Sequence, residues 1–191
     1  MVGFLDRFET VKVTGPIANR IWLPVHTKTG LRGFISSKYL AKGDGALAKE
    51  LWCMENLGPR PKNGAIFIQK EMGDHALTID NGRDQDAIVK LRNLSGKTVL
   101  SFYVWARNKV RIDSVPEGTY RVQFACGDSY SNRCGFFMEG MICLVFSDLT
   151  SFRTKSDNRY IYKSSIEYTL HRVIGGTVQA MPIDSQDFLG E

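Results

Sequence analysis

Long apolar runs are absent from this sequence, and so is the pattern of a secretory signal peptide. No stretch approaches the roughly 18 apolar residues that a membrane-spanning helix needs. The first residues, MVGFLDRFETVKV, lack a basic start, a continuous apolar segment and a small-residue cleavage site. We therefore expect a soluble chain without an export address of its own, unless one was removed from a longer parent.

Metal-ligand motifs are also missing. The sequence has four cysteines but no CxxC pair, and its three histidines lie far apart, which disfavours a zinc site. Cys126 and Cys134 bracket seven residues, a loop that a disulfide could close in an oxidising compartment. The alternative is a pair of half-buried thiols, because free cysteine is often a core residue. We favour the thiols, since nothing else in the sequence indicates export.

The signatures of common catalytic sites are absent as well. Neither a G-x-S-x-G elbow nor a phosphate-binding P-loop occurs. We expect His26 and His75 at the surface, next to turns. In the alternating segment that contains His171, Glu167 falls on the same strand face as His171. Such a pair is more typical of a solvated strand face than of a catalytic site.

Acidic residues do not supply a metal site either. Asp80, Asp84 and Asp86 are close in sequence, but the segment has too few regularly spaced oxygen ligands for a calcium loop, which favours a turn solubilised by acidic residues. We therefore expect a protein that is not an enzyme and that holds no cofactor and no metal. A hydrolase with an unrecognised cysteine or histidine site is the weaker alternative.

Charge of one sign is not gathered into runs. The formal net charge is +5 and the pI is about 9.0, but Lys and Arg are scattered along the chain. Scattered charges usually mark a solvated exterior. This modest excess favours contact with anionic surfaces, yet it disfavours nucleic acid as the main partner.

What the sequence does contain is a succession of short alternating segments. Residues 8–41 predict three strands, with a hairpin turn at TKTG and a helical turn at SSKYL. ALAKELWCM predicts a helix, and ENLGPRPKNG predicts an extended linker. From Ala65 onward nearly all segments read as strands, ending in RYIYKSSIEYTLHRV, residues 159–173, where Ile166, Tyr168 and Leu170 share one face. The fold class is therefore all-β, with an antiparallel β-sandwich.

The segment GDSYSNRCGFF, residues 127–137, is polar and then abruptly apolar. Sandwiches tend to carry function on their end loops. We interpret this segment as a rim loop that recognises a partner rather than as an active site. Its expected binding residues are Asp128, Ser129, Tyr130 and Arg133.

The N-terminal segment resembles the second half of a bacterial SH3 (SH3b) domain. The matching residues are Trp22, Gly30, Gly33, Phe34, Ser36, Tyr39 and Leu40. The strand and loop that usually open such a barrel are missing, so the resemblance implies an incomplete SH3-like meander. If its groove is open, Trp22, Phe34 and Tyr39 form an aromatic binding platform. The alternative is that Trp22 and Phe34 are core residues of a plain meander.

The C-terminal region resembles the prealbumin-like sandwiches, such as the regulatory domain attached to some carboxypeptidases. The resemblance rests on VRIDSVPEGTYRVQFA, in which Gly118 supplies the turn, and Tyr120, Val122 and Phe124 are expected to face the core. LTIDNGRDQDAIVKL is similar to bacterial accessory modules of unknown function. Both resemblances imply binding or support rather than catalysis.

Three parts are expected along the chain. They are an SH3b-like segment at residues 1–45, a helical and proline-containing connector at 46–64, and the sandwich at 65–191. We expect a non-catalytic interaction module of a bacterial envelope or secreted protein that binds a protein or a cell-wall component. The alternative is a cytoplasmic protein-binding inhibitor or immunity-type protein. The expected location is the envelope or the exterior if the parent is exported, and the cytoplasm otherwise.

Overall fold

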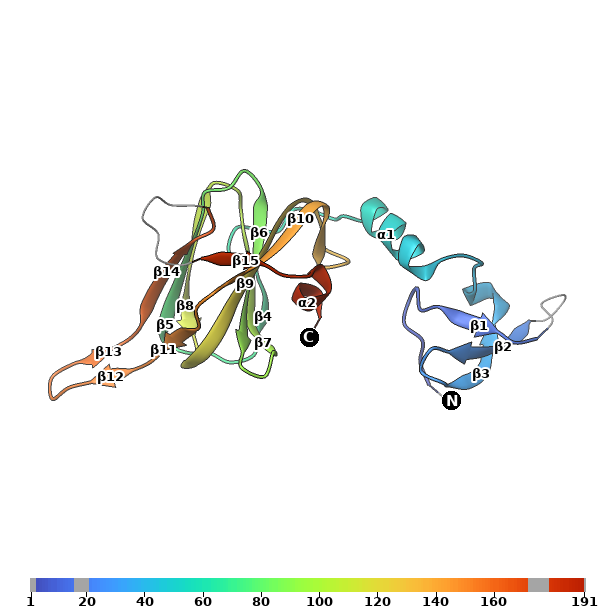
Figure 1. Cartoon of the computed structure of the whole chain (residues 1–191), viewed down its shortest axis with the longest axis horizontal. Helices are drawn as coiled ribbons and strands as arrows, with labels where there is room; N and C mark the ends of the chain where they lie inside the picture. Colours follow the sequence, from blue (N-terminus) through green and yellow to red (C-terminus); the bar gives the residue numbers. More distant parts are fainter. Residues whose placement is uncertain (1–2, 16–20, 172–178, 191) are drawn as a thin grey trace. The chain divides into compact units, whose positions relative to one another are not determined.

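The computed structural model describes residues 3–15, 21–171 and 179–190 of the chain. The chain divides into two compact units, Met1–Asn56 and Leu57–Glu191. The division falls inside the stretch that the sequence predicts as a connector. Strands make up most of the regular structure of the second unit, and a three-stranded sheet with one helix forms the first (Figure 1), so the predicted all-β class is confirmed for the chain.

The first unit carries a three-stranded antiparallel sheet in the order β1-β2-β3. The strands are β1 (Val11–Val13), β2 (Trp22–Thr27) and β3 (Arg32–Ser36), and the 3-10 turn η1 (Ser37–Tyr39) follows. The β2–β3 hairpin closes at the TKTG turn, where Gly30 has a φ of 87°, a backbone conformation that favours glycine. The three strands, the hairpin turn and the helical turn predicted from the sequence are confirmed.

Helix α1 (Gly45–Glu55) covers the segment that the sequence predicts as helical. The Asp44 carboxylate caps its N-terminus by accepting a hydrogen bond of 2.8 Å from a backbone N–H. Trp52 packs on Phe8, with ring centroids 5.8 Å apart, and the Arg7 guanidinium lies 4.2 Å from the centroid of the Trp52 ring. These contacts anchor α1 to the segment that precedes β1.

The second unit is a two-layer β-sandwich. Its larger sheet has the order β15-β10-β9-β6-β7-β4, and β11 also pairs with β9. The strands of this sheet are β4 (Ile66–Gln69), β6 (Asp86–Asn93), β7 (Thr98–Val104), β9 (Gly118–Ser131), β10 (Phe136–Phe146), β11 (Thr150–Phe152) and β15 (Ala180–Pro182). The smaller sheet, in the order β14-β5-β8, consists of β14 (Ser165–Thr169), β5 (His75–Asn81) and β8 (Asn108–Val115).

The strand pairing of this sandwich is antiparallel with one exception in the described residues. Strand β14 runs parallel to β5, with Ile166 opposite Leu77 and Tyr168 opposite Ile79. The antiparallel sandwich predicted from the sequence is otherwise confirmed. Its prealbumin-like character stays a prediction.

The main core lies between the two sheets. Tyr120, Val122 and Phe124 of β9 point into it, as predicted, and Leu77 and Ile79 of β5 meet them from the other layer. The Tyr120 hydroxyl also donates hydrogen bonds of 3.2 and 3.1 Å to two backbone carbonyls of the turn before β9. One buried ring therefore fills the core and fixes the turn that starts the longest strand.

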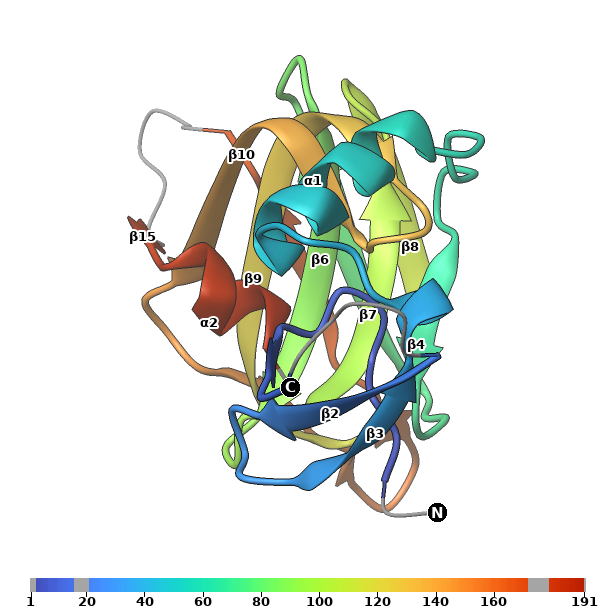
Figure 2. The same ribbon diagram turned by 90° about the vertical axis from the view of Figure 1, so that its right-hand side faces the viewer.

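A second, smaller cluster covers the outer face of the larger sheet. The short helix α2 (Ser185–Leu189) lies beside β9 and β10 (Figure 2) and buries Phe188 completely. Lys90 and Arg92 of β6 each donate a hydrogen bond of 2.8 Å to the Phe188 carbonyl. Cations at the C-terminal end of a helix satisfy its last carbonyls and oppose its dipole. This arrangement holds the C-terminal segment on the sheet.

The single long strand predicted at residues 159–173 is wrong in its extent. Strand β13 (Ile161–Tyr162) pairs with β12 (Lys155–Ser156) in a separate hairpin, and β14 then pairs with β5. The chain changes partner at Ser164, whose N–H donates to the His75 ring at 3.0 Å. The core-facing side chains of β14 are those that the alternation predicts, and residues 172–173 lie outside the described residues.

Candidate functional site

The outer face of the β1–β3 sheet presents two large aromatic side chains. Trp22 is directly opposite Ser36, and Phe34 is opposite Pro24, so Trp22 and Phe34 are diagonal neighbours on one face. Their side chains are 60% and 71% exposed. Leu23, the residue after Trp22 on β2, points to the opposite face of the sheet and is buried. The sequence left open whether Trp22 and Phe34 belong to a core or to a platform. The structure places both at the surface.

Tyr39 lies on η1, directly after β3, and is 71% exposed. The N–H of Ser37 donates a hydrogen bond of 2.8 Å to the Ile21 carbonyl, which ties the start of η1 to the residue before Trp22. The Lys38 ammonium is 4.7 Å from the centroid of the Tyr39 ring, a cation–π contact. We call Trp22, Phe34 and Tyr39 the aromatic face.

Cations border the aromatic face. Lys12 of β1 and Arg32 of β3 both lie opposite His26 in the register and are exposed, so they share the face of Trp22 and Phe34. Rings offer their flat surfaces for stacking, and flanking cations favour a ligand that carries carboxylates or other anionic groups. The chemistry available here is recognition of an amphipathic, partly anionic ligand.

The second predicted group lies on a β-hairpin rather than in an open loop. Strands β9 and β10 continue through most of residues 127–137, with Tyr130 opposite Phe137, and only a tight turn at 132–135 joins them. Asp128 accepts a hydrogen bond of 2.7 Å from Gln85, and Ser129, at a φ of 55°, donates one of 3.2 Å to Glu139. The segment is therefore a β-hairpin, and the prediction that it forms a rim loop is wrong.

Tyr130 is a packing residue in this hairpin. Its ring lies 5.7 Å from Phe67, 5.1 Å from Tyr103 and 5.4 Å from Phe137, measured between centroids. Burial raises the pKa of Tyr130 to about 12. Of the four residues predicted in this segment, Asp128 and Arg133 are exposed, and neither lies on the same unit as the aromatic face.

A polar hub that the sequence did not reveal lies next to this cluster. Asp86 accepts two hydrogen bonds from the Arg60 guanidinium, of 2.7 and 2.6 Å, one of 2.8 Å from the Tyr103 hydroxyl and one of 2.7 Å from the N–H of Ala106. Burial raises the pKa of Asp86, but these donors outweigh it, so the pKa lies below its usual value. The hub fixes structure, because every carboxylate oxygen already has protein donors.

The acidic turn predicted around Asp80, Asp84 and Asp86 is thus only partly right. Asp84 is exposed and pairs with the exposed Arg107, whereas Asp86 is the partly buried centre of the hub. No group of three or more His, Cys, Asp or Glu side chains that could hold a metal ion occurs among the described residues.

The histidines do not come together at one site. His75 was expected at the surface, but it is 2% exposed: its Nδ1 accepts from the Ser164 N–H, and its ring lies 6.0 Å from Phe152. Glu167 and His171 are both exposed, as a solvated strand face predicts, and Glu167 accepts a hydrogen bond of 2.7 Å from Lys109. His75 is buried because its partners come from far away in the sequence.

The Cys126–Cys134 disulfide that the sequence left open is not formed, and Cys126 is a buried thiol, as the favoured alternative expects. Cys126 is a free thiol in the middle of β9, where its side chain belongs to the sandwich core. Cys143 of β10 is free and buried as well, within the outer cluster under α2. Alternation along β9 turns Cys126 inward, away from the hairpin tip that carries Cys134.

We predict that these two thiols resist alkylation in the native protein. Burial raises the pKa of Cys126 and of Cys143 to about 11 each. At about pH 8 the thiolate fraction alone slows iodoacetamide by roughly a hundredfold, before steric protection is counted. Peptide mapping after a native labelling pulse, with a pulse in denaturant as control, measures this. Equal labelling in both pulses would contradict the burial.

Comparison with known proteins identifies no relative: no family model, no curated protein and no solved structure matches the chain. Within the described residues, neither helix is long and apolar enough to cross a membrane.

Proposed function

We propose that the chain is a non-catalytic interaction module of a bacterial envelope or secreted protein. It binds a protein or a cell-wall component through the aromatic face. The observation that carries this proposal is the exposure of Trp22 and Phe34 side by side on one face of the β1–β3 sheet. Large apolar side chains that gather on a surface mark interaction sites more often than single exposed ones.

The composition of the face supports a ligand with both apolar and anionic parts. Aromatic rings supply a large contact area at a low cost in conformational entropy, and they are typical of binding hot spots. Lys12, Arg32 and Lys38 surround them with positive charge. Cell-wall polymers combine the sugar rings of their glycan strands with the carboxylates of their peptides, and many protein surfaces combine apolar side chains with carboxylates. The SH3b-like resemblance of this segment agrees with such a role.

The proposal is tested by co-sedimentation with purified bacterial cell walls. The double variant Trp22→Ala/Phe34→Ala is expected to bind at least about tenfold more weakly than the wild type, because truncating a hot-spot aromatic usually costs more than 1.4 kcal/mol. The matched control is Leu47→Ala/Leu51→Ala, which removes two apolar side chains of similar exposure from α1 of the same unit. It is expected to sediment like the wild type.

Two results would count against the proposal in different ways. If the folded wild type does not sediment with cell walls, the cell-wall ligand is wrong, and the cytoplasmic protein-binding alternative becomes the better account. If the wild type sediments and the double variant sediments equally well, the aromatic face is not the binding surface.

A further inference from the structure

The β12–β13 hairpin projects from the sandwich (Figure 1). Its turn is fixed by Asp157, whose carboxylate accepts backbone hydrogen bonds of 2.8 Å from Arg159 and 2.7 Å from Tyr160, and one of 2.9 Å from the Tyr162 hydroxyl. The N–H of Asp157 also donates to the Tyr160 carbonyl at 3.0 Å. The hairpin is therefore preorganised although its side chains are exposed.

One face of this hairpin carries cations on one strand and tyrosines on the other. Lys155 lies opposite Tyr162, and the rings of Tyr160 and Tyr162 are 6.3 Å apart between centroids. At the base, the Ser164 hydroxyl joins the backbone of Arg153 by hydrogen bonds of 2.9 and 3.0 Å. We call Arg153, Lys155, Tyr160 and Tyr162 the hairpin strip.

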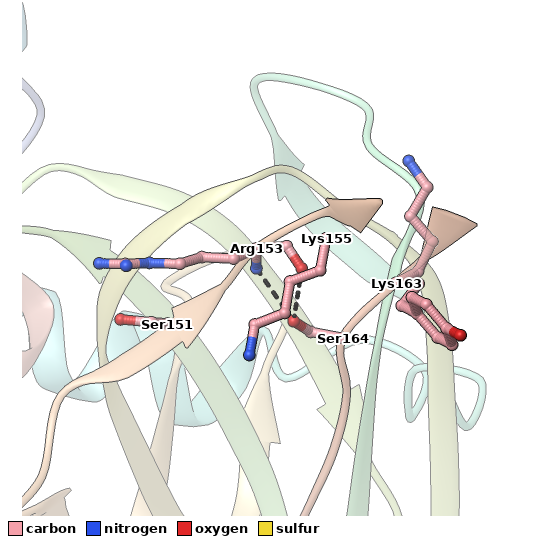
Figure 3. A pocket seen from close by; sticks show the side chains of 6 residues that line it. Ser151, Arg153, Lys155, Lys163 and Ser164 are labelled. Carbon is pink, nitrogen blue, oxygen red and sulfur yellow. Dashed lines mark hydrogen bonds between the residues drawn. The ribbon is translucent and has the colours of Figure 1, made fainter. Parts of the chain in front are cut away.

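The base of the strip is hollow. A pocket of about 470 Å³ is lined by Ser151, Arg153, Lys155, Tyr162, Lys163 and Ser164 (Figure 3). In the same view the side chain of Lys163 extends away from that of Lys155. The Lys163 ammonium donates a hydrogen bond of 2.9 Å to the Asp74 carboxylate. The free space therefore lies next to Arg153 and Lys155, with serine hydroxyls beside them.

The cations of the strip have no compensating charge. Among the described residues, no carboxylate pairs with the side chain of Arg153 or Lys155, whereas Lys163 is paired with Asp74. Residues 150–165 contain four cations and one acid, so this short segment holds a net charge of +3 out of +5 for the whole chain. The even scatter of charge along the rest of the sequence conceals this concentration.

Exposed planar rings distinguish the strip from a simple anion site. Tyr160 and Tyr162 are 63% and 52% exposed, on the side where the free cations lie. A positively charged track beside successive aromatic rings is the arrangement that binds single-stranded nucleic acid, in which phosphates meet the cations and bases stack on the rings. A membrane would instead favour an apolar tip, but this tip holds Asp157, Asn158 and Arg159.

We propose that the hairpin strip binds single-stranded nucleic acid. Arg153 and Lys155 contact successive phosphates, and Tyr160 and Tyr162 stack on bases. Alternate residues of extended backbone are about 6.6 Å apart, and the ring centroids of Tyr160 and Tyr162 are 6.3 Å apart. This site lies on the second unit and is independent of the function proposed for the aromatic face.

The test is fluorescence anisotropy of a labelled oligothymidylate with the full chain over a series of salt concentrations. Two phosphate contacts predict a slope of about −1.4 in a plot of log K against log salt. Arg153→Gln/Lys155→Gln is expected to abolish most of this slope. The matched control is Lys70→Gln/Lys97→Gln, which removes two exposed cations elsewhere on the same unit and is expected to leave the slope nearly unchanged.

Stacking is tested separately at Tyr160, whose hydroxyl has no partner among the described residues. Tyr160→Ala is expected to weaken binding at least about fivefold, whereas Tyr160→Phe keeps the ring and the affinity. The proposal is overturned if the wild type does not bind the oligonucleotide at low salt. It is also overturned if an abasic oligomer or duplex DNA binds equally well, if only anionic lipid vesicles bind, or if the lysine control loses as much affinity as the strip variant.

Discussion

Replacement of Phe124 by alanine is expected to destabilise the sandwich by about 3–5 kcal/mol, the usual range for a buried phenylalanine. Phe124 is 1% exposed on the central strand β9, and its ring centroid lies 5.2 Å from that of Phe146. The cost has two parts, the lost transfer free energy of the ring and the cavity that it leaves between two sheets. Few substitutions in this chain combine so complete a burial with so large a side chain.

Urea denaturation followed by circular dichroism measures this effect as a fall in the transition midpoint at an unchanged slope. The control is Leu94→Ala, because Leu94 is 71% exposed in the turn between β6 and β7, and its truncation is expected to change the free energy of unfolding by less than about 0.5 kcal/mol. A loss at Phe124 as small as that at Leu94 would mean that the Phe124 side chain does not lie in the core between the two sheets.

The second large effect is expected at the hub. Asp86→Ala removes the acceptor of four hydrogen bonds and leaves the buried Tyr103 hydroxyl without its partner, a change that costs about 3 kcal/mol. The neighbouring Asp84→Ala is the matched control. Within the part of the chain that the structure describes, its partner is the exposed Arg107, and exposed ion pairs contribute about 0–1 kcal/mol.

The hub also sets a pH dependence with a definite sign. The pKa of Asp86 in the folded protein lies below its unfolded value of 3.8, so the stabilisation is fully present above that value and is lost as the pH falls through the folded pKa. The difference in stability between the wild type and Asp86→Asn is therefore expected to shrink on acidification below about pH 4. A difference that stays constant down to the acid transition would contradict the assignment.

Local patterns in the sequence predicted the elements whose partners are close along the chain. The β2–β3 hairpin, helix α1 and the inward face of β9 at Tyr120 and Phe124 follow from turn residues and alternation. The exposure of Trp22 and Phe34 did not follow, because alternation separates two faces without saying which one a second layer covers.

The errors arose where distant residues decide the environment. His75 follows turn-forming residues, but it is buried because Ser164 and Phe152 close over it. The same switch at Ser164 sends β14 to pair in parallel with β5, an arrangement that no local pattern signals. The hairpin at residues 127–137 looked like a loop, because polar residues such as Asp128 and Ser129 occupy positions in its paired strands. Long-range pairing overrode local propensity at His75 and at β14.

Whether the aromatic face is the binding surface is measured with the three tryptophans as reporters. Their indole N–H groups give three signals in a proton–nitrogen correlation spectrum. Trp22 is exposed on the face, Trp52 packs on Phe8, and the Trp105 indole donates to the Pro61 carbonyl at 2.7 Å. On titration with soluble cell-wall fragments, the Trp22 signal alone is expected to shift and to saturate. Shifts confined to Trp52 or Trp105, or a Trp22 signal that stays fixed while the fragments bind, would contradict this expectation.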